Sequence, residues 1–246
     1  MWTTIWHTFF FDPTYNLLIF IAGLVPGGDV GIAIIAFTIV MKLILLPLSL
    51  KAAHTQYVMR LLEPRLNEIK EKYKENREEL AKKTMAAYKE AGVNPLLSIL
   101  LLFIQIPILI ALFFAVASGG GVKLPDVNVD LLYSFISHPG MLTMQFFGAF
   151  DITQKSIVLA LLAGVTQYIQ GHISLPPLKE KTSTEPNLKD DLARSMQLQM
   201  KYMMPIVIAI AAFTTSAAIA LYFVVSNLMA IAQEYVVRKQ IPNRHV

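Results

Sequence analysis

Long apolar runs, separated by charged or polar stretches, dominate the hydropathy pattern of the chain. A membrane-spanning helix needs about 20 mostly apolar residues to cross the hydrocarbon core. The pattern predicts spans at 31–50, 94–117, 155–172, 201–214 and 217–237. The last two are divided because the apolar stretch 202–237 is too long for one ordinary span and holds a polar cluster, residues 214–216, at its middle.

The segments between the predicted spans are 1–30, 51–93, 118–154, 173–200 and 238–246. In 51–93 apolar residues recur every three to four positions, which predicts two amphipathic helices folded as a hairpin. We expect Pro64 to kink or start a helix there, and Asn76 to separate the two helices. A solvated charged arm is an equally good interpretation of the charges in this segment. The segment 118–154 is apolar enough to lie on the bilayer, and 173–200 is rich in proline.

Basic residues are distributed very unevenly among these segments. Residues 1–30 hold none, 51–93 hold ten, 118–155 hold two, 171–202 hold five and the tail from residue 238 holds three. Because cytoplasmic segments carry the excess of Lys and Arg, the N-terminus is predicted outside the cell and the C-terminus in the cytoplasm. Segments rich and poor in basic residues alternate along the chain, and this alternation agrees with an odd number of spans.

The N-terminal segment 1–30 is apolar and aromatic but has no basic residue, so we expect it not to act as a cleaved signal peptide. Its Trp and Tyr residues suit the membrane interface. An extra span at 15–25 is the competing interpretation, although 11 residues are too few and a sixth span would spoil the charge alternation.

Composition excludes several classes of protein. Of the 246 residues 55% are hydrophobic and 15% are charged, against about 25% charged in soluble domains. The chain has no cysteine, which rules out disulfides and thiolate chemistry. The sequence contains no HExxH, GxSxG or GxxxxGK[ST] motif, and its five histidines are scattered. We therefore expect no enzyme, no metal site, no cofactor and no nucleotide requirement.

Lys42 is the only charged residue well inside a predicted span. It lies eleven residues from Gly31 and nine from Lys51, which places it about 13–17 Å from either end of a straight helix. An ammonium group at that depth costs about 2.5–3.5 kcal/mol on insertion scales, and no deep acidic residue is available to pair with it. Hydration in a polar groove is one interpretation, and snorkelling of the long side chain toward the cytoplasm is the other.

Further polar residues lie within or between the predicted spans and could line such a groove. They are Gln105, Gln167, Thr214, Thr215, Ser216, Ser226 and Asn227. Each taken alone is more often a residue that hydrogen-bonds one helix to another. We hypothesise that together with Lys42 they line a hydrated groove that attracts polar or anionic chain segments transiently.

Several ordered motifs of the chain resemble those of the YidC/Oxa/Alb membrane protein insertases, over about residues 31–239. They are KLILLPL at 42–48, LLEPRLNEIKEKY at 61–73, VNPL and IQIP within 87–113, and ALYFVVSN with the following AxxQE in the final apolar stretch. The chain is similar to a short bacterial member. The groove arginine of the family falls on Lys42, which keeps the charge without the planar fork of donors.

The resemblance implies a fold and a function. The fold is an all-α membrane protein, a single insertase domain over 1–246, with five transmembrane helices around a hydrophilic groove and a cytoplasmic helical hairpin. The implied function is insertion of nascent membrane proteins into the bacterial cell membrane, with the glutamine of the Q-x-P motif at Gln105 lining the groove. Residues expected to contact substrates or partners are Pro107, Met200, Met203, Met204 and Phe213.

The partners implied are nascent membrane proteins and the lipid bilayer, with the ribosome, signal recognition machinery and a Sec translocon as further candidates, and no DNA. The methionines near residue 200 are also compatible with ordinary packing. A small anion or solute transporter or channel is the alternative function, because a buried cation in a polar cavity can bind an anion. The paired, symmetric halves that many transporters show are not visible in this sequence.

Overall fold

The computed structural model describes residues 2–174, 195 and 198–240, and it divides into two compact units. Unit 1 comprises residues 1–42 and 106–231, and unit 2 comprises residues 43–105 and 232–246. The predicted segments 173–200 and 238–246 lie largely outside the described residues.

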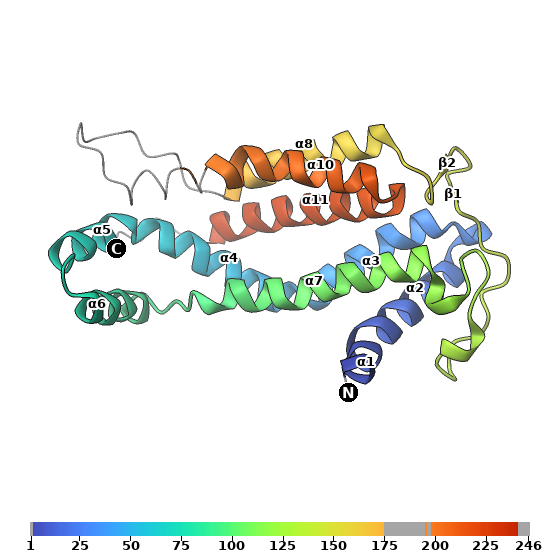
Figure 1. Cartoon of the computed structure of the whole chain (residues 1–246), viewed down its shortest axis with the longest axis horizontal. Coiled ribbons are helices and arrows are strands. Elements are labelled where there is room, and N and C mark those ends of the chain that lie inside the picture. The colour runs from blue at the N-terminus through green and yellow to red at the C-terminus, as the bar shows by residue number, and fades with distance from the viewer. Residues whose placement is uncertain (1, 175–194, 196–197, 241–246) are drawn as a thin grey trace. The chain divides into compact units, whose positions relative to one another are not determined.

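The first 44 residues are helical almost throughout (Figure 1). The elements are α1 (Trp2–Trp6), the π-helix η1 (His7–Phe11), α2 (Asp12–Leu24), the 3-10 turn η2 (Pro26–Gly28) and α3 (Val30–Ile44). Tyr15, Leu18, Ile19 and Ala22 recur at helical spacing along α2 and are fully buried. This buried stripe makes α2 an amphipathic helix that packs into unit 1.

Polar side chains of α2 hold the segment after residue 118 in place. The Asn16 amide donates to the carbonyl oxygen of Leu131 at 2.8 Å, and its oxygen accepts the Tyr133 N–H at 2.7 Å. The Tyr15 hydroxyl accepts the N–H of Asn128 at 2.9 Å. These bonds satisfy backbone groups of an irregular segment that has few regular hydrogen bonds of its own.

That irregular segment contains two 3-10 turns, η3 (Gly119–Gly121) and η4 (Val129–Leu131), and a two-stranded antiparallel hairpin. In the hairpin, β1 (Gln145–Phe146) pairs with β2 (Phe150–Asp151). Asp29 ties the hairpin to α3, because its carboxylate accepts the N–H of Ile32 at 3.1 Å and that of Phe147 at 2.8 Å. One buried side chain thus caps the start of α3 and anchors the turn between the strands.

Three further helices come from the C-terminal half of the chain, and the last of them continues from unit 1 into unit 2 after residue 231. They are α8 (Ile157–Ser174), α10 (Met204–Thr214) with the π-helix η5 (Gln199–Met203) before it, and α11 (Ala217–Gln240). The first N–H groups of α11 are satisfied by loop carbonyls, since Ala217 donates to Gln154 at 2.8 Å and Ala218 to Ile152 at 3.0 Å. The chain turns between α10 and α11 at Thr215, so the predicted break at residues 214–216 is confirmed.

Within the described residues, three helices are long and apolar enough to cross a membrane, or four if the bent pair α3 and α4 (Leu46–Leu61) counts as one span. The three are α7 (Leu96–Ala117), α8 and α11. The stretch Gln199–Thr214, which holds the predicted fourth span, is apolar but shorter. The chain is therefore a mostly helical multi-span protein, and the arrangement of five spans stays a prediction.

The predicted span 31–50 is not one straight helix. It breaks at Leu45, and α3 and α4 meet at an angle of 67°. Pro47 lies in the first turn of α4, where it has no N–H to donate, and in an unbroken helix its ring would crowd the carbonyl of Leu43. The depth of Lys42 estimated from Lys51 along a straight helix is consequently wrong, whereas its separation of about 17 Å from Gly31 along α3 stands.

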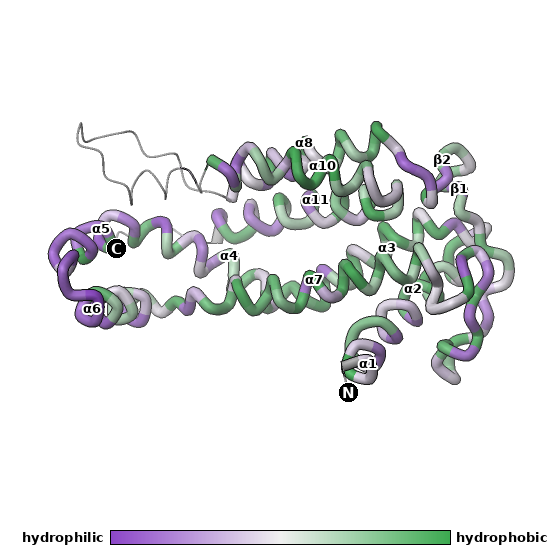
Figure 2. Tube along the Cα trace, in the orientation of Figure 1, coloured by the Kyte–Doolittle hydropathy of each residue, from purple (hydrophilic) through white to green (hydrophobic). Residues whose placement is uncertain are grey.

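Unit 2 contains α4, α5 (Glu63–Lys72) and α6 (Arg77–Glu90), of which α5 and α6 are the most hydrophilic of the described helices (Figure 2). As expected, Pro64 lies in the first turn of a helix, and Asn76 separates α5 from α6 by accepting the N–H of Glu79 at 3.1 Å. A core of Val58, Leu62, Leu66, Ala87 and Val93 joins α4, α5 and α6. Burial against this core raises the pKa of the Tyr88 hydroxyl.

Candidate functional site

Lys42 lies near the end of α3, two residues before the helix stops at Ile44, and its side chain is partly buried. Among the described carboxylates of unit 1, none is within ion-pairing distance of the Lys42 ammonium. The sequence predicted a cation without a resident counter-ion, and within the described part of unit 1 this is what the structure has. Such a charge near an apolar helix needs water or a transient anion for its stabilisation.

Asn227 and Ser226 lie side by side on α11, and both are buried. The Asn227 amide donates to the Thr166 hydroxyl at 3.2 Å and to the Ala163 carbonyl at 3.4 Å, so it ties α11 to α8. This is the helix–helix bonding role that polar residues commonly have in membranes. The Ser226 hydroxyl, in contrast, has no hydrogen-bond partner among the residues that the structure describes.

Four other predicted groove residues also have local roles in unit 1. The hydroxyls of Thr214 and Thr215 donate to carbonyls one turn back, at 2.9 Å and 2.7 Å. Ser216 follows them in the link to α11, and its carbonyl accepts the N–H of Ala220 at 3.2 Å. Gln167 donates to Gln170 on its own helix α8 at 3.3 Å. Each of these four residues thus makes a local hydrogen bond that explains its presence. Their part in a polar groove stays a hypothesis.

Gln105 belongs to unit 2, at the point where α7 passes from one unit to the other, and is partly buried. Pro107, two residues further on, lies inside α7 and removes one N–H from the helix ladder. Met200, Met203, Met204 and Phe213 are exposed on η5 and α10, each by 40–54%. Large apolar side chains at that exposure form a surface suited to lipid or to another apolar segment.

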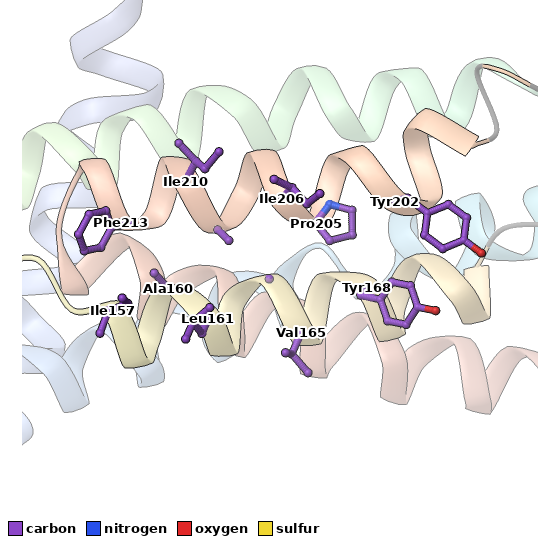
Figure 3. Close-up of a pocket in the computed structure, with 12 residues that line it drawn as sticks. Ile157, Ala160, Leu161, Val165, Tyr168, Tyr202, Pro205, Ile206, Ile210 and Phe213 are labelled. Carbon is purple, nitrogen blue, oxygen red and sulfur yellow. The ribbon is translucent and has the colours of Figure 1, made fainter.

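An apolar groove runs between α8 and α10, with a volume of about 590 Å³ (Figure 3). We call it the α8–α10 groove. Its lining comes only from these two helices and from η5: Ile157, Ala160, Leu161, Gly164, Val165, Tyr168, Tyr202, Pro205, Ile206, Ala209, Ile210 and Phe213. Hydropathy alone could not find it, because the groove depends on which two helices pack together.

A buried ion-pair cluster in unit 2 is the other feature that sequence reasoning missed. Glu234 on α11 is 3% exposed, and its carboxylate lies 3.2 Å from the Arg238 guanidinium and 3.7 Å from that of Arg60 on α4. One residue earlier, Gln233 accepts the Ser49 hydroxyl at 2.9 Å. The i,i+4 spacing of Glu234 and Arg238 is visible in the sequence, but the contact with Arg60 requires the fold.

Comparison with known proteins identifies the family. The family model described as 60Kd inner membrane protein matches residues 20–244, which is most of the chain. The chain belongs to this family. The resemblance to the YidC/Oxa/Alb insertases, inferred above from short motifs, is thereby confirmed.

Several curated proteins that are similar to this chain are named membrane protein insertases. A "Membrane protein insertase YidC" from Alkalihalophilus pseudofirmus is 32% identical over 243 residues, covering 94% of this chain and 81% of the relative. "Membrane protein insertase MisCA" of Bacillus subtilis is 29% identical over 239 residues, covering 95% and 79%. A "Membrane protein insertase YidC" from Cellvibrio japonicus is 30% identical over 239 residues, which cover 96% of this chain but only 37% of that longer relative. The chain therefore matches short members of the 60Kd family over most of their length.

Proposed function

We propose that this protein is a membrane protein insertase of the bacterial cell membrane rather than an enzyme. The observation that carries the proposal is the family match over residues 20–244, together with relatives named insertases that this chain covers over about four fifths of their length. The helices long and apolar enough to span a membrane agree with it.

The proposed mechanism begins with the polar flank of a nascent membrane protein. This flank enters a hydrated groove from the cytoplasm and is attracted by the Lys42 ammonium, which has no carboxylate partner in the described part of unit 1. Gln105, Gln167, Ser226 and the polar link at 214–216 supply hydrogen-bonding groups. The groove shortens the path of the polar flank through hydrocarbon, which lowers the barrier to its transfer.

The apolar segment of the client follows a different route, along the lipid-exposed faces of α7 and α10 near Pro107, Met203, Met204 and Phe213. Transfer of about 20 apolar residues from water into lipid supplies the driving force. Methionine side chains adapt to clients of different sequence. No nucleotide enters this scheme, because partition into lipid is itself downhill.

The proposed topology has five spans, the N-terminus outside and α5 and α6 in the cytoplasm, as the distribution of basic residues favours. The α5–α6 pair carries most of the basic residues of its segment on exposed faces, which makes it a receiving surface for clients, the ribosome or targeting partners. Anionic lipid is a further ligand for these charges.

Reconstitution tests the function directly. The purified full chain, in liposomes of phosphatidylethanolamine and phosphatidylglycerol, is expected to insert a single-span client with an acidic outer tail, so that the tail becomes protected from added protease. Liposomes without the protein serve as the control. Equal protection in both samples would contradict the proposal. Flux of a small anion without client insertion would instead support the transporter alternative.

A further inference from the structure

The α8–α10 groove combines an apolar channel with an exposed cation at one end. Lys155, just before α8, is exposed, and its ammonium lies 5.9 Å from the centre of the Phe213 ring, which lines the groove. The opposite end is closed by Tyr168 and Tyr202, whose ring centres are 6.1 Å apart (Figure 3). At that end the Lys201 ammonium lies 5.8 Å from the Tyr202 ring centre, but Lys201 is only 9% exposed. The exposed ammonium is therefore at the Phe213 end, and the lining between the two ends is apolar.

The depth of the groove comes from small residues at its floor. Ala160, Gly164 and Ala209 let α8 and α10 approach closely, and an added Cβ at Gly164 would lie 2.9 Å from the Cβ of Ala209. The rims are large side chains that are more than half exposed, Leu161 and Val165 on α8 and Ile206 and Ile210 on α10. Small residues flanked by such rows form a channel for a slender apolar chain.

The length of the groove argues against a spanning helix as its occupant. Tyr202 to Phe213, like Ile157 to Tyr168, covers twelve residues, or about 16 Å along a helix from the first to the last. A transmembrane helix needs about 30 Å, so the groove extends over about one leaflet of a bilayer. Its volume of about 590 Å³ falls in the range of about 300–1,000 Å³ that is typical of sites for small molecules.

We propose that the α8–α10 groove is a binding site for one acyl chain of an anionic phospholipid, whose phosphate is held by Lys155. The apolar lining matches the acyl chain, the length matches a single leaflet, and the cation at the groove end matches the phosphate. The site is independent of the proposed insertase activity, because it needs only the two helices, the lysine and a surrounding bilayer.

Photolabelling with a defined lipid tests the site. The full chain is placed in nanodiscs of phosphatidylcholine that contain phosphatidylglycerol with a diazirine in one acyl chain, and labelled peptides are identified by mass spectrometry. We expect label on α8 and α10 at the groove rims. Val165→Trp, which fills the channel, should reduce this label severalfold. Val158→Trp is the matched control, because Val158 is equally exposed on α8 but does not line the groove.

The charge is tested separately. Lys155→Ala should reduce labelling by the phosphatidylglycerol probe severalfold and labelling by a phosphatidylcholine probe of the same chain less, because the choline cation offsets the charge of that phosphate, while Lys155→Arg retains both. Equal labelling of the two tryptophan variants would overturn the proposal. So would cross-linking of a benzoylphenylalanine at position 206 to an inserting client instead of lipid, since the occupant would then be a protein segment.

Discussion

Lys42 is the residue on which the proposed insertion mechanism depends, because its charge near the end of α3 lacks a carboxylate partner in the described part of unit 1. We predict that Lys42→Ala slows insertion of a client with an acidic tail by about tenfold, the factor that corresponds to 1.4 kcal/mol of lost attraction. Lys42→Arg keeps the charge and should stay close to the parent protein. Protease protection of the client in liposomes measures the rate.

Lys51→Ala is the control for this prediction, since Lys51 is an exposed lysine on α4 and loses the same charge from the chain. An acidic client should be affected by the change at Lys42 and not by that at Lys51, and a client with a neutral tail should be affected by neither. If Lys42→Ala inserts the acidic client at the parent rate, the charge has no part in the mechanism.

Two ion pairs of unit 2 differ in burial and should differ in their contribution to stability. Glu234 is 4% exposed at its side chain, whereas Glu90 and Arg65 form a 2.6 Å pair in which the side chains are 59% and 51% exposed. We predict that Glu234→Gln lowers the free energy of unfolding by about 3 kcal/mol, because it removes a buried carboxylate that lies 3.7 Å from the mostly buried Arg60 guanidinium. Glu90→Gln should cost at most about 1 kcal/mol.

Thermal unfolding of both variants in detergent checks this pair of predictions, and Arg60→Met with Glu234→Gln completes a double-mutant cycle. The cycle should show coupling between Arg60 and Glu234, which lie 3.7 Å apart on α4 and α11. Unfolding temperatures that drop equally for Glu234→Gln and Glu90→Gln would show that burial of Glu234 does not increase its contribution to stability.

At the scale of elements, the packing of α8 on α10 depends on one of two glycines in α8. A Cβ at Gly164 would meet the Ala209 Cβ at 2.9 Å and the Pro205 carbonyl oxygen at 3.3 Å, whereas a Cβ at Gly171 finds its nearest neighbour at 4.0 Å. We therefore predict that Gly164→Ala destabilises the protein by about 1–3 kcal/mol, because the helices must move apart. The same substitution at Gly171 should be neutral or stabilising, as alanine favours a helix.

The two alanine variants are compared by thermal unfolding in detergent, and they are matched because residue type, helix and substitution are the same. The Gly164→Ala variant should also show less photolabel in the α8–α10 groove, since its floor is displaced. Equal unfolding temperatures for the two variants would mean that α8 and α10 do not pack as closely as the structure has them.

The sequence predicted elements better than it predicted their contacts. Helical periodicity located the apolar helices, the polar residues at 214–216 marked the break after α10, and Asn76 marked the start of α6. The break of α3 at Leu45 was not predicted, because a proline can sit in the first turn of a new helix or inside a kinked one, and Pro47 alone does not decide between them.

Contacts over long sequence distances escaped prediction for a different reason. The bond of Asn16 to Leu131 joins residues 115 positions apart, and that of Ser49 to Gln233 joins residues 184 apart. Neither pair shows a periodicity that would connect them. The same holds for the predicted groove, where Asn227 bonds Thr166 on another helix and the hydroxyls at 214–215 bond carbonyls one turn back, and no hydropathy pattern reveals these partners. Composition thus identifies polar residues in spans without telling a packing role from a functional one.

At the scale of the whole molecule, the number of spans is testable because the chain has no cysteine, so that any single introduced cysteine is a unique label. Thr3→Cys and Asp126→Cys place exposed thiols in the N-terminal segment and the irregular segment, and Lys74→Cys and Lys239→Cys place them after α5 and near the end of α11. With five spans, the first two should react with an impermeant maleimide added outside cells. The other two should react only after the membrane is opened.

The thiol at position 239 distinguishes five spans from four, because its side of the membrane depends on whether the short stretch Gln199–Thr214 crosses the bilayer. If this stretch only enters the bilayer and returns, an even number of spans puts both ends of the chain on one side, and Lys239→Cys reacts from outside together with Thr3→Cys. The charge argument opposes that result, since Arg238, Lys239 and Arg244 would then face outward. At about 1.5 Å per residue the 16 residues of this stretch reach about 24 Å, so crossing requires local thinning of the bilayer.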